Sequence, residues 1–289
     1  MAAPRLESNL PVVRTVAELR AAVAEWRGAE ARVGLVPTMG ALHAGHLALV
    51  HAAVAAADKV VATIFVNPTQ FGEGEDFASY PRDQADDLAM LAAAGADLTF
   101  IPAVDEVYPP GFTTTVSVGA LTDGLCGAFR PGHFEGVATV VAKLLIQAGA
   151  DIAFFGEKDY QQLRVIRRLV RDLDIPVEIA GVRTVREADG LALSSRNAYL
   201  TPEQRRIAPI LHEILVTIAD NVGAGVRRGG DVAESGRKLL LEAGFDRVDY
   251  VAVCDAETLV PVETAKRPAR VFAAAWLGRT RLIDNIAVD

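Results

Sequence analysis

The sequence is poor in cysteine and has no excess of basic residues. Its 289 residues include 2 cysteines, Cys126 and Cys254, which are too few for a disulfide framework or a cysteine metal cluster. We expect both to be buried thiols in a reducing compartment. The 29 basic and 37 acidic residues give a net charge of −8. This balance argues against general nucleic-acid binding, although a local basic pocket for an anionic small molecule is compatible with it.

Long apolar runs and targeting signals are also missing. Runs such as Val60 to Val66 are far below the roughly 20 residues that a membrane-spanning helix needs. The segment Met1 to Val13 has no charged start followed by an apolar stretch, so we expect no secretory signal. These features predict a cytoplasmic protein that does not bind membranes. Only 5 of the 29 basic residues are lysines, so each lysine in a polar motif deserves a functional explanation.

The first two thirds of the chain alternate between short apolar runs and alanine-rich stretches with helical spacing. This alternation favours an α/β fold, with a parallel sheet covered by helices on both faces. The predicted strands are residues 33–36, 60–66, 98–101, 152–155 and 176–182, and the predicted helices are residues 45–57, 83–94, 136–148 and 160–172.

The pattern changes after Arg183, and we expect a domain boundary near 184/185. Thr201 is a good N-cap for one long helix over Pro202 to Asn221, and the glycines at 223, 225, 229 and 230 should end it. A helix over 232–243 and three antiparallel strands over 248–253, 270–274 and 281–288 should follow. The sequence thus predicts a larger domain over residues 1–184 and a smaller α+β domain over residues 185–289.

The first chemical motif is the turn Pro37-Thr38-Met39-Gly40-Ala41-Leu42-His43-Ala44-Gly45-His46, between a predicted strand and a predicted helix. Ligands bind beyond the carboxyl ends of parallel strands, and a helix N-terminus attracts phosphate. His43 and His46 project from the same side of the first helical turn. We interpret the pair as functional, and the alternative is two polar side chains on a solvated turn.

The second motif is Phe154-Phe155-Gly156-Glu157-Lys158-Asp159-Tyr160-Gln161-Gln162, again at a strand end before a helix. The compact ammonium of Lys158 suits a polyphosphate. For Asp159, a purely structural role as a helix cap is the alternative to a functional one. Gln162 could reach a ligand hydroxyl or carboxylate, or could be an ordinary surface residue.

The third motif, residues 186–197, ends in Leu193-Ser194-Ser195-Arg196-Asn197 just after the predicted boundary. Two hydroxyls and a guanidinium are good donors to pyrophosphate oxygens, and a glycine-bearing loop could close over a nucleotide. An interdomain linker with a capping serine is an equally open reading.

Two weaker signals complete the set. The segment 65–72 follows the strongest predicted strand and places two amides beside apolar walls, as a pocket for a small hydroxy acid requires. Asp86 and Asp87 could meet a metal ion, but on a charged helix we interpret them as part of a solvated face.

Five segments together resemble the pantoate–β-alanine ligase (pantothenate synthetase) family nearly end to end. An H-x-G-H turn alone would be less specific, because nucleotidylyl transferases and class I aminoacyl-tRNA synthetases share it. The matching segments are PTMGALHAGHL at 37–47, FVNPTQFG at 65–72, CGAFRPGHFEGVATVV at 126–141, FGEKDYQQL at 155–163 and DGLALSSRNAYL at 189–200.

The resemblance implies a two-step ligase. The carboxylate of (R)-pantoate attacks the α-phosphate of ATP, and the amine of β-alanine then attacks the resulting pantoyl adenylate to give pantothenate and AMP. It also implies Mg²⁺ carried with ATP, a cytoplasmic homodimer, and a Rossmann-like N-terminal domain of the nucleotidylyl transferase type with a C-terminal lid.

Carried over residue by residue, the resemblance assigns a site to this sequence. His46 matches the catalytic histidine, and Gln70 and Gln162 match the pantoate and β-alanine contacts. The residues expected in transition-state stabilisation are His43, His46, Lys158, Ser194, Ser195 and Arg196. The expected ATP contacts are Met39, Gly40, Ala41, Leu42, His43, Ala44, Gly45, His46, Gly156, Glu157, Lys158, Asp159, Val185, Leu193, Ser194, Ser195 and Arg196, and no protein ligand to a metal is expected.

Two rival functions remain open at this point. One is another H-x-G-H nucleotidylyl transferase, which attaches a nucleotide to a phosphate-bearing acceptor. The other is a non-catalytic nucleotide-binding module, which would bind ATP without releasing pyrophosphate.

Overall fold

The computed structural model describes residues 10–72, 74–78, 80–226, 228–264 and 268–288. The chain forms two compact units: the first comprises residues up to 118, 132–157 and 165–183, and the second comprises 119–131, 158–164 and 184 onward. Two segments that precede residue 184 therefore belong to the second unit. Most of the segment searched for a secretory signal, residues 1–9, lies outside the described residues.

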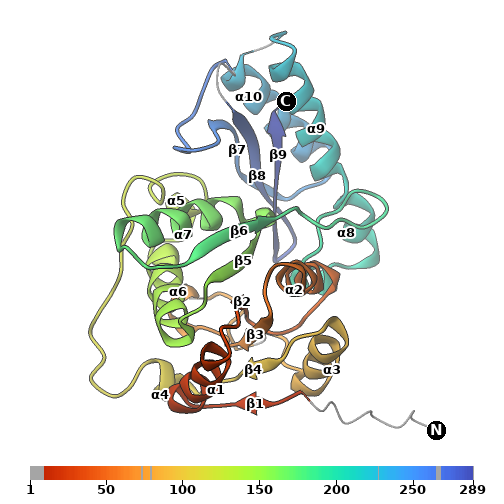
Figure 1. Ribbon diagram of the computed structural model, residues 1–289. Coiled ribbons are helices and arrows are strands. Elements are labelled where there is room, and N and C mark those ends of the chain that lie inside the picture. Colours follow the sequence, from red (N-terminus) through yellow and green to blue (C-terminus); the bar gives the residue numbers. More distant parts are fainter. Residues whose placement is uncertain (1–9, 73, 79, 227, 265–267, 289) are drawn as a thin grey trace, which may run out of the picture. The chain divides into compact units, whose positions relative to one another are not determined.

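The first unit is built on a six-stranded sheet with the order β1-β4-β3-β2-β5-β6, drawn in Figure 1. Every paired strand is parallel to its neighbour, as predicted. Five of the six residues of β2 are buried, because a parallel sheet is covered on both faces. The strands are β1 (Val12–Val13), β2 (Val33–Thr38), β3 (Lys59–Ile64), β4 (Leu98–Phe100), β5 (Ile152–Gly156) and β6 (Glu178–Val182).

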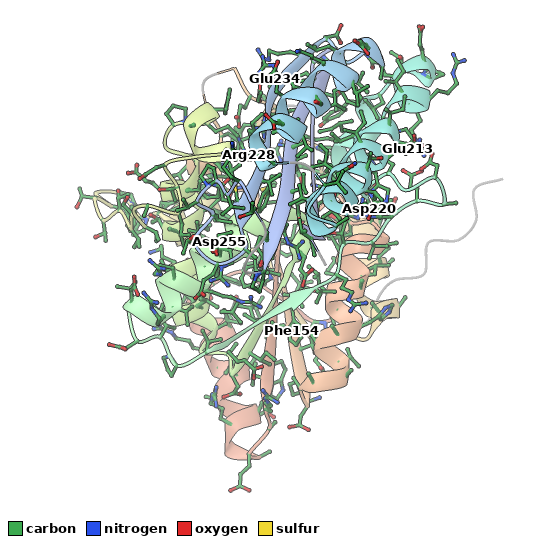
Figure 2. All side chains as sticks on the ribbon, turned by 90° about the horizontal axis from the view of Figure 1, so that it is seen from above. Phe154, Glu213, Asp220, Arg228, Glu234 and Asp255 are labelled. Carbon is green, nitrogen blue, oxygen red and sulfur yellow. The ribbon has the colours of Figure 1, made fainter. Side chains whose placement is uncertain are left out.

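Helices cover both faces of this sheet (Figure 1). On one face, α2 and α3 bury Val50 and Leu91 against Phe154 of β5, which Figure 2 labels. On the other face, α1 packs against α6, and α6 contacts β2. The helical elements of the first unit are α1 (Val16–Gly28), α2 (Ala44–Ala56), η1 (Pro68–Gln70), α3 (Gln84–Ala94), α4 (Val104–Val107) and α6 (His133–Ala148).

The second unit pairs three antiparallel strands with two longer helices. Its strands are β7 (Arg247–Asp255), β8 (Ala269–Leu277) and β9 (Thr280–Val288), in that order in the sheet. Its helical elements are α5 (Cys126–Phe129), η3 (Ser195–Tyr199), α8 (Pro202–Ile207), α9 (Ile210–Gly223) and α10 (Gly229–Glu242). Between the β5 strand and β6, η2 (Glu157–Asp159) and α7 (Tyr160–Asp172) pass through both units.

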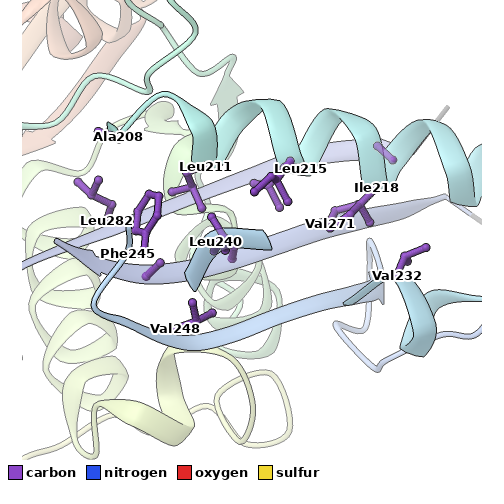
Figure 3. Packing of buried hydrophobic residues seen from close by; sticks show 14 of the residues in the cluster. Ala208, Leu211, Leu215, Ile218, Val232, Leu240, Phe245, Val248, Val271 and Leu282 are labelled. Atoms are coloured by element: carbon purple, nitrogen blue, oxygen red, sulfur yellow. The ribbon is translucent and has the colours of Figure 1, made fainter. Parts of the chain in front are cut away.

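The core of the second unit lies between α9, α10 and one face of the sheet (Figure 3). Leu211, Leu215, Leu240 and Val271 are at most 2% exposed in this cluster. The opposite side of α9 is polar and carries Glu213 and Asp220, labelled in Figure 2. This amphipathic division confirms the small α+β fold predicted for the C-terminal part.

Two predicted helix boundaries in this region are wrong. The helix expected over Pro202 to Asn221 is broken into α8 and α9 at Pro209, because proline lacks the N–H that continues a helix. The predicted start, with Thr201 as N-cap, is confirmed by its capping box with Gln204. α10 begins at Gly229 rather than at Val232. A Cβ atom on Gly229 would lie 2.1 Å from the Val262 oxygen, so this glycine permits close packing instead of ending a helix.

No helix in the described part of the chain combines the length and the apolar composition that crossing a membrane requires. Cys126 and Cys254 are both free and buried, as predicted.

Candidate active site

Three neighbouring strands of the first unit end at the same edge of the sheet, and each is followed by a segment singled out in the sequence. β2 lies between β3 and β5, and Thr38 at its end pairs with Ile64 of β3. Gln70 follows β3, the segment Met39–His46 follows β2, and β5 ends at Gly156 with Glu157 directly after it. The connection order reverses between β2 and β5, which is where ligands bind in open parallel sheets.

The turn after β2 has a backbone shape that suits close approach of a ligand. Gly40 and Ala41 both have positive φ angles, +80° and +51°. The Thr38 hydroxyl donates to the Thr63 carbonyl at 2.6 Å and accepts from the Gly40 N–H at 3.2 Å. Because non-glycine residues rarely adopt positive φ, the conformation of Ala41 must be maintained by surrounding contacts.

Asp87 provides those contacts, and its interpretation as part of a solvated face is wrong. The residue is 2% exposed and accepts hydrogen bonds from the N–H groups of Ala41 at 3.0 Å and Leu42 at 2.8 Å. Burial raises the pKa of the Asp87 carboxyl, against the opposing effect of these two hydrogen bonds. A Cβ atom on Gly40 would lie 2.8 Å from Asp87 Oδ2, so glycine is required for the carboxylate to reach the turn.

The sequence contains a signal for this buried role of Asp87. Asp87, Leu91 and Ala94 follow the i, i+4, i+7 spacing of one helix face, and all three are buried. A carboxylate in line with apolar positions is the kind of buried polar group that needs dedicated partners. Asp86, one position earlier, is exposed.

The two histidines form the cap of α2. His43 is the N-cap, and its Nδ1 accepts from the Gly45 N–H at 3.1 Å, while Nδ1 of His46 accepts from the His43 N–H at 3.3 Å. Their ring centroids are 4.1 Å apart. Since Nδ1 is an acceptor in both rings, each neutral imidazole carries its proton on Nε2. Both side chains therefore present a donor at the helix N-terminus.

An amide cluster follows β3. Nδ2 of Asn67 donates to Oε1 of Gln70 at 3.0 Å, and Nε2 of Gln70 lies 3.1 Å from the sulfur of Met39. Tyr108 donates to Oδ1 of Asn67 at 2.8 Å, and Nδ1 of His133 lies 2.8 Å from the Gln70 carbonyl oxygen. These contacts orient the Gln70 side chain beside the turn that carries the histidines.

Helix α6 supports this cluster at very short range. A Cβ atom on Gly136 would lie 2.4 Å from the Thr69 oxygen, and the Gly136 carbonyl accepts from Nδ2 of Asn67 at 3.1 Å. α6 begins at His133, three residues before the predicted start. Gly136 is thus an internal helix residue whose missing side chain lets η1 approach.

The predicted site residues from Lys158 onward belong to the second unit. Lys158, in η2, has a side chain that is 20% exposed, with Nζ 3.8 Å from the Asp159 carboxylate. Gln161, three residues after Lys158, is buried. Its Nε2 donates to the Leu121 and Gly124 carbonyls, and its Oε1 accepts from the Cys126 N–H, so its role is structural. Gln162 is half-buried.

The third motif begins with a short hairpin. The Leu193 N–H donates to the Val185 carbonyl at 3.0 Å, and Arg186 pairs with Ala192 in an antiparallel bridge. Ser194 then caps η3 through a 3.3 Å contact from the Arg196 N–H to its hydroxyl. Ser194, Ser195 and Arg196 therefore stand at the start of a helical turn.

The structure groups the predicted site residues in two sets. The first unit holds Met39 to His46, Gln70, Gly156 and Glu157, and the second unit holds Lys158, Asp159, Gln162, Val185 and Leu193 to Arg196. That the two sets contact one nucleotide stays a prediction.

Comparison with known proteins identifies the family of this chain. The family model described as pantoate-beta-alanine ligase matches residues 11–287. The pantothenate synthetase of Paramagnetospirillum magneticum is 61% identical over 284 residues, which cover 98% of this chain and 100% of the relative. That of Rhodospirillum rubrum is 56% identical over 281 residues, with 96% and 99% of the two chains covered.

Solved structures give the same result. The pantothenate synthetase of Thermus thermophilus superimposes with a TM-score of 0.91 at 51% identity and covers 96% of this chain and 99% of its own. A pantoate-beta-alanine ligase of Francisella tularensis, in complex with beta-gamma ATP and beta-alanine, has a TM-score of 0.81 at 33% identity and covers 96% and 97% of the two chains. The fold, the histidine turn at the switch point and these full-length matches together show that this chain belongs to the pantoate–β-alanine ligase family.

Proposed function

We propose that this protein catalyses the ATP-dependent condensation of (R)-pantoate with β-alanine to pantothenate, AMP and pyrophosphate. Its family membership over residues 11–287 is the observation that carries the proposal. The first unit supports it by presenting helix-capping histidines and an amide cluster at the carboxyl ends of adjacent strands.

In the first step, a carboxylate oxygen of pantoate attacks the α-phosphorus of ATP. The bond from that phosphorus to the bridging oxygen breaks, and pyrophosphate leaves. Negative charge increases on the α-phosphate and on the leaving group, so donors fixed around them stabilise the transition state. Nε2–H of His46 and of His43 supply such donors from the first unit, and the amides of Gln70 and Gln162 bind pantoate.

Lys158 and the segment Ser194–Arg196 supply the other donors from the second unit. An ammonium acts on a polyphosphate as a point charge, and a guanidinium binds two phosphate oxygens at once. The ATP site also includes the backbone of Met39 to Leu42, Gly156, Val185 and Leu193. We assign nucleotide and pantoate binding to residues 1–184 and a lid function to residues 185–289.

In the second step, the amine of β-alanine attacks the acyl carbon of pantoyl adenylate, and AMP leaves. The amine loses a proton as the amide forms. The acyl group is already activated, so orientation of the amine can supply about 7–11 kcal/mol of the barrier reduction. No protein nucleophile is needed.

Mg²⁺ belongs to this proposal as a companion of ATP. The described residues contain no group of three or more His, Cys, Asp or Glu side chains that could hold a metal ion. Mg²⁺ bound to substrate phosphates needs only one or two protein carboxylates, because phosphate oxygens and waters fill its remaining positions. We therefore propose that Mg²⁺ enters with ATP and is held mainly by the nucleotide, and we assign it no dedicated protein ligand.

A cytoplasmic homodimer completes the proposal. Two free, buried thiols suit a reducing compartment. Sedimentation of the purified protein at several concentrations measures the oligomeric state, and a monomer at all concentrations would contradict this part.

The function is tested by following pyrophosphate. The purified protein is incubated with ATP, Mg²⁺ and pantoate, and β-alanine is added after the first product has formed. We expect pyrophosphate release that requires pantoate but not β-alanine, and pantothenate identified by mass only after the second addition. Pyrophosphate release only with a phosphate-bearing acceptor would favour a nucleotidylyl transferase, and ATP binding without any release would favour a non-catalytic module.

A further inference from the structure

Two successive buried polar residues on β9, Asp284 and Asn285, contact the two segments of the second unit that carry proposed ATP contacts. They are 4% and 3% exposed. Successive side chains on a strand point to opposite faces. Asp284 therefore lies on the face that packs against α9, and Asn285 lies on the face that packs against the segment around Lys158.

Asn285 holds the backbone of Lys158. Its Nδ2 donates to the Lys158 carbonyl oxygen at 2.9 Å, and its Oδ1 accepts a hydrogen bond from the Arg270 guanidinium. A guanidinium can only donate, so this contact fixes which end of the amide faces Lys158. The donated hydrogen bond to the Lys158 carbonyl is therefore set by the surrounding structure.

Other contacts from the same part of the fold hold Tyr160, the first residue after η2. The Arg270 guanidinium lies 4.0 Å from the centroid of the Tyr160 ring, and the Tyr160 hydroxyl donates to the Ala256 carbonyl at 3.1 Å. The ring of Phe272 lies 6.0 Å from that of Tyr160. η2 is thus held at the Lys158 carbonyl by Asn285 and, just after its last residue, by the contacts of Tyr160.

Asp284 holds the hairpin that leads to Ser194. Its two carboxylate oxygens accept from the two terminal nitrogens of Arg186 at 2.7 and 2.9 Å, and Arg186 also donates to the Gly190 carbonyl at 3.0 Å. Burial raises the pKa of Asp284, but His212 and Arg186 outweigh this effect and leave it below the ordinary value. The hairpin is therefore joined to β9 by a bidentate pair with an ionised carboxylate.

Arg205 holds the same hairpin from its outer side. It donates to Asp189 at 2.7 Å and to the Glu187 carboxylate. The β9 strand also contacts η3 directly. The hairpin before Ser194 is thus joined to β9 through Arg186 and to α8 through Arg205, and η3 itself contacts β9.

We propose that Asp284 and Asn285 are positioning residues that together set the spacing between Lys158 and the segment Ser194–Arg196. The proposal rests on the proposed function, in which these two groups stabilise charge on one triphosphate. Neither residue contacts the substrate in this scheme. Each acts through a segment that does, and a displacement of about 1 Å in such a donor costs on the order of 100-fold in rate.

The test is a double-mutant cycle between Asn285 and Lys158. Asn285→Asp has the same shape but cannot donate to the Lys158 carbonyl. At saturating ATP and pantoate, we expect it to slow single-turnover pyrophosphate release by about 10- to 100-fold. In a Lys158→Ala background the same change should slow release by less than about twofold, because residues that act through one group are not additive.

A purely structural role of Asn285 would slow the reaction equally in both backgrounds, and that result would overturn the proposal. Asn285→Ala is measured alongside, since it removes the donor without adding charge and should show the same dependence on Lys158. The matched control is Asn221→Asp, whose amide donates to the Thr217 carbonyl at 2.7 Å within its own helix and should change the rate less than about twofold.

Thermal unfolding of every variant identifies those that fold, and the cycle uses whichever Asn285 variant does. If neither folds with a wild-type transition, the cycle uses Arg270→Lys, which keeps the charge and alters the donor to Asn285 Oδ1, and equal slowing in both backgrounds again overturns the proposal. A wild-type protein that releases no pyrophosphate with pantoate would refute the proposed function instead, so the two failures are distinguishable.

Discussion

The backbone N–H of Leu42 donates to Oδ1 of Asp87 at 2.8 Å, although 45 positions separate the two residues. Oδ2 of the same carboxylate accepts from the Ala41 N–H. One side chain of α3 therefore stabilises two consecutive residues of the turn, including Ala41 with its positive φ of 51°. Since the turn leads directly into the His43 cap, its conformation determines where both imidazoles lie.

Asp87→Asn should disturb this turn without changing the size of the side chain. An amide has one acceptor oxygen, so one of the two buried N–H groups loses its partner, at a cost of about 1–3 kcal/mol. We expect a lower thermal midpoint and pyrophosphate release slowed at least about tenfold by the misplaced donors. Asp86→Asn is the exposed control and should match the wild type. Unchanged kinetics of Asp87→Asn would show that the turn keeps its shape without the carboxylate.

His46→Ala and Lys158→Ala should each slow formation of the adenylate by about 10²–10³, as the loss of a transition-state donor does. Single-turnover pyrophosphate release with saturating ATP and pantoate measures this step. The controls are His51→Ala, an exposed residue of α2, and Lys238→Ala, whose side chain is 68% exposed. Wild-type rates in both site variants would discard the assignment of these residues to the first step.

Gln70→Ala should weaken the binding of pantoate much more than that of ATP, because it removes an amide from the proposed acid pocket. Equilibrium titration of each ligand separately measures the two effects. Asn67 contacts the Gln70 side chain, and His133 contacts the Gln70 main-chain carbonyl. The His133 contact does not involve the side chain that is removed, so we expect a local effect and a nearly unchanged thermal midpoint. Equal weakening of both ligands would mean that the pantoate pocket lies elsewhere.

Gly136→Ala should disturb the proposed pantoate pocket indirectly, through the packing of α6 against η1. The added Cβ atom would lie 2.4 Å from the Thr69 oxygen and 2.7 Å from the Gln70 nitrogen, so η1 or α6 must move. We expect reduced stability and a higher KM for pantoate. Gly28→Ala, where no atom lies within 4 Å of the new Cβ, is the matched control. If Gly136→Ala binds pantoate normally, the close packing of these segments is not needed for the pocket.

The stabilising effect of Asp284 should depend on pH. Its pKa is lowered in the folded protein, so the contribution is present above the unfolded value of about 3.9 and is lost as pH falls through the folded value. Replacement by Asn removes the charged partner of Arg186, at a cost on the order of 3 kcal/mol near neutral pH. Urea unfolding from pH 7 to pH 3 should show the difference from wild type shrinking below about pH 4.

The matched control for this measurement is Asp220→Asn, on the exposed side of α9. Its difference from wild type should stay small throughout the series. A difference for Asp284→Asn that does not change with pH would contradict ionisation of Asp284 as the source of its stabilisation.

Local patterns were sufficient for most of the secondary structure. The apolar run before Pro37 and the capping residue Thr201 predict elements that the structure confirms. Errors arose where a tertiary contact changed the meaning of a residue. Gly229 reads as a helix breaker but permits contact with Val262, and Asp87 reads as a surface charge but is buried against a turn. Residue type cannot distinguish these cases, because the deciding neighbour is remote in sequence.

The amino-acid sequence by itself determined the parallel sheet, the antiparallel C-terminal strands and the family, because periodicity, capping and short motifs are local properties. Only the tertiary structure decided which polar side chains hold the motifs in place. Asp87 and Leu42 are brought together by helix packing, and Asn285 and Lys158 by the face of a strand. Their hydrogen bonds depend on distances of about 3 Å between remote segments, and such distances exist only after the chain has folded.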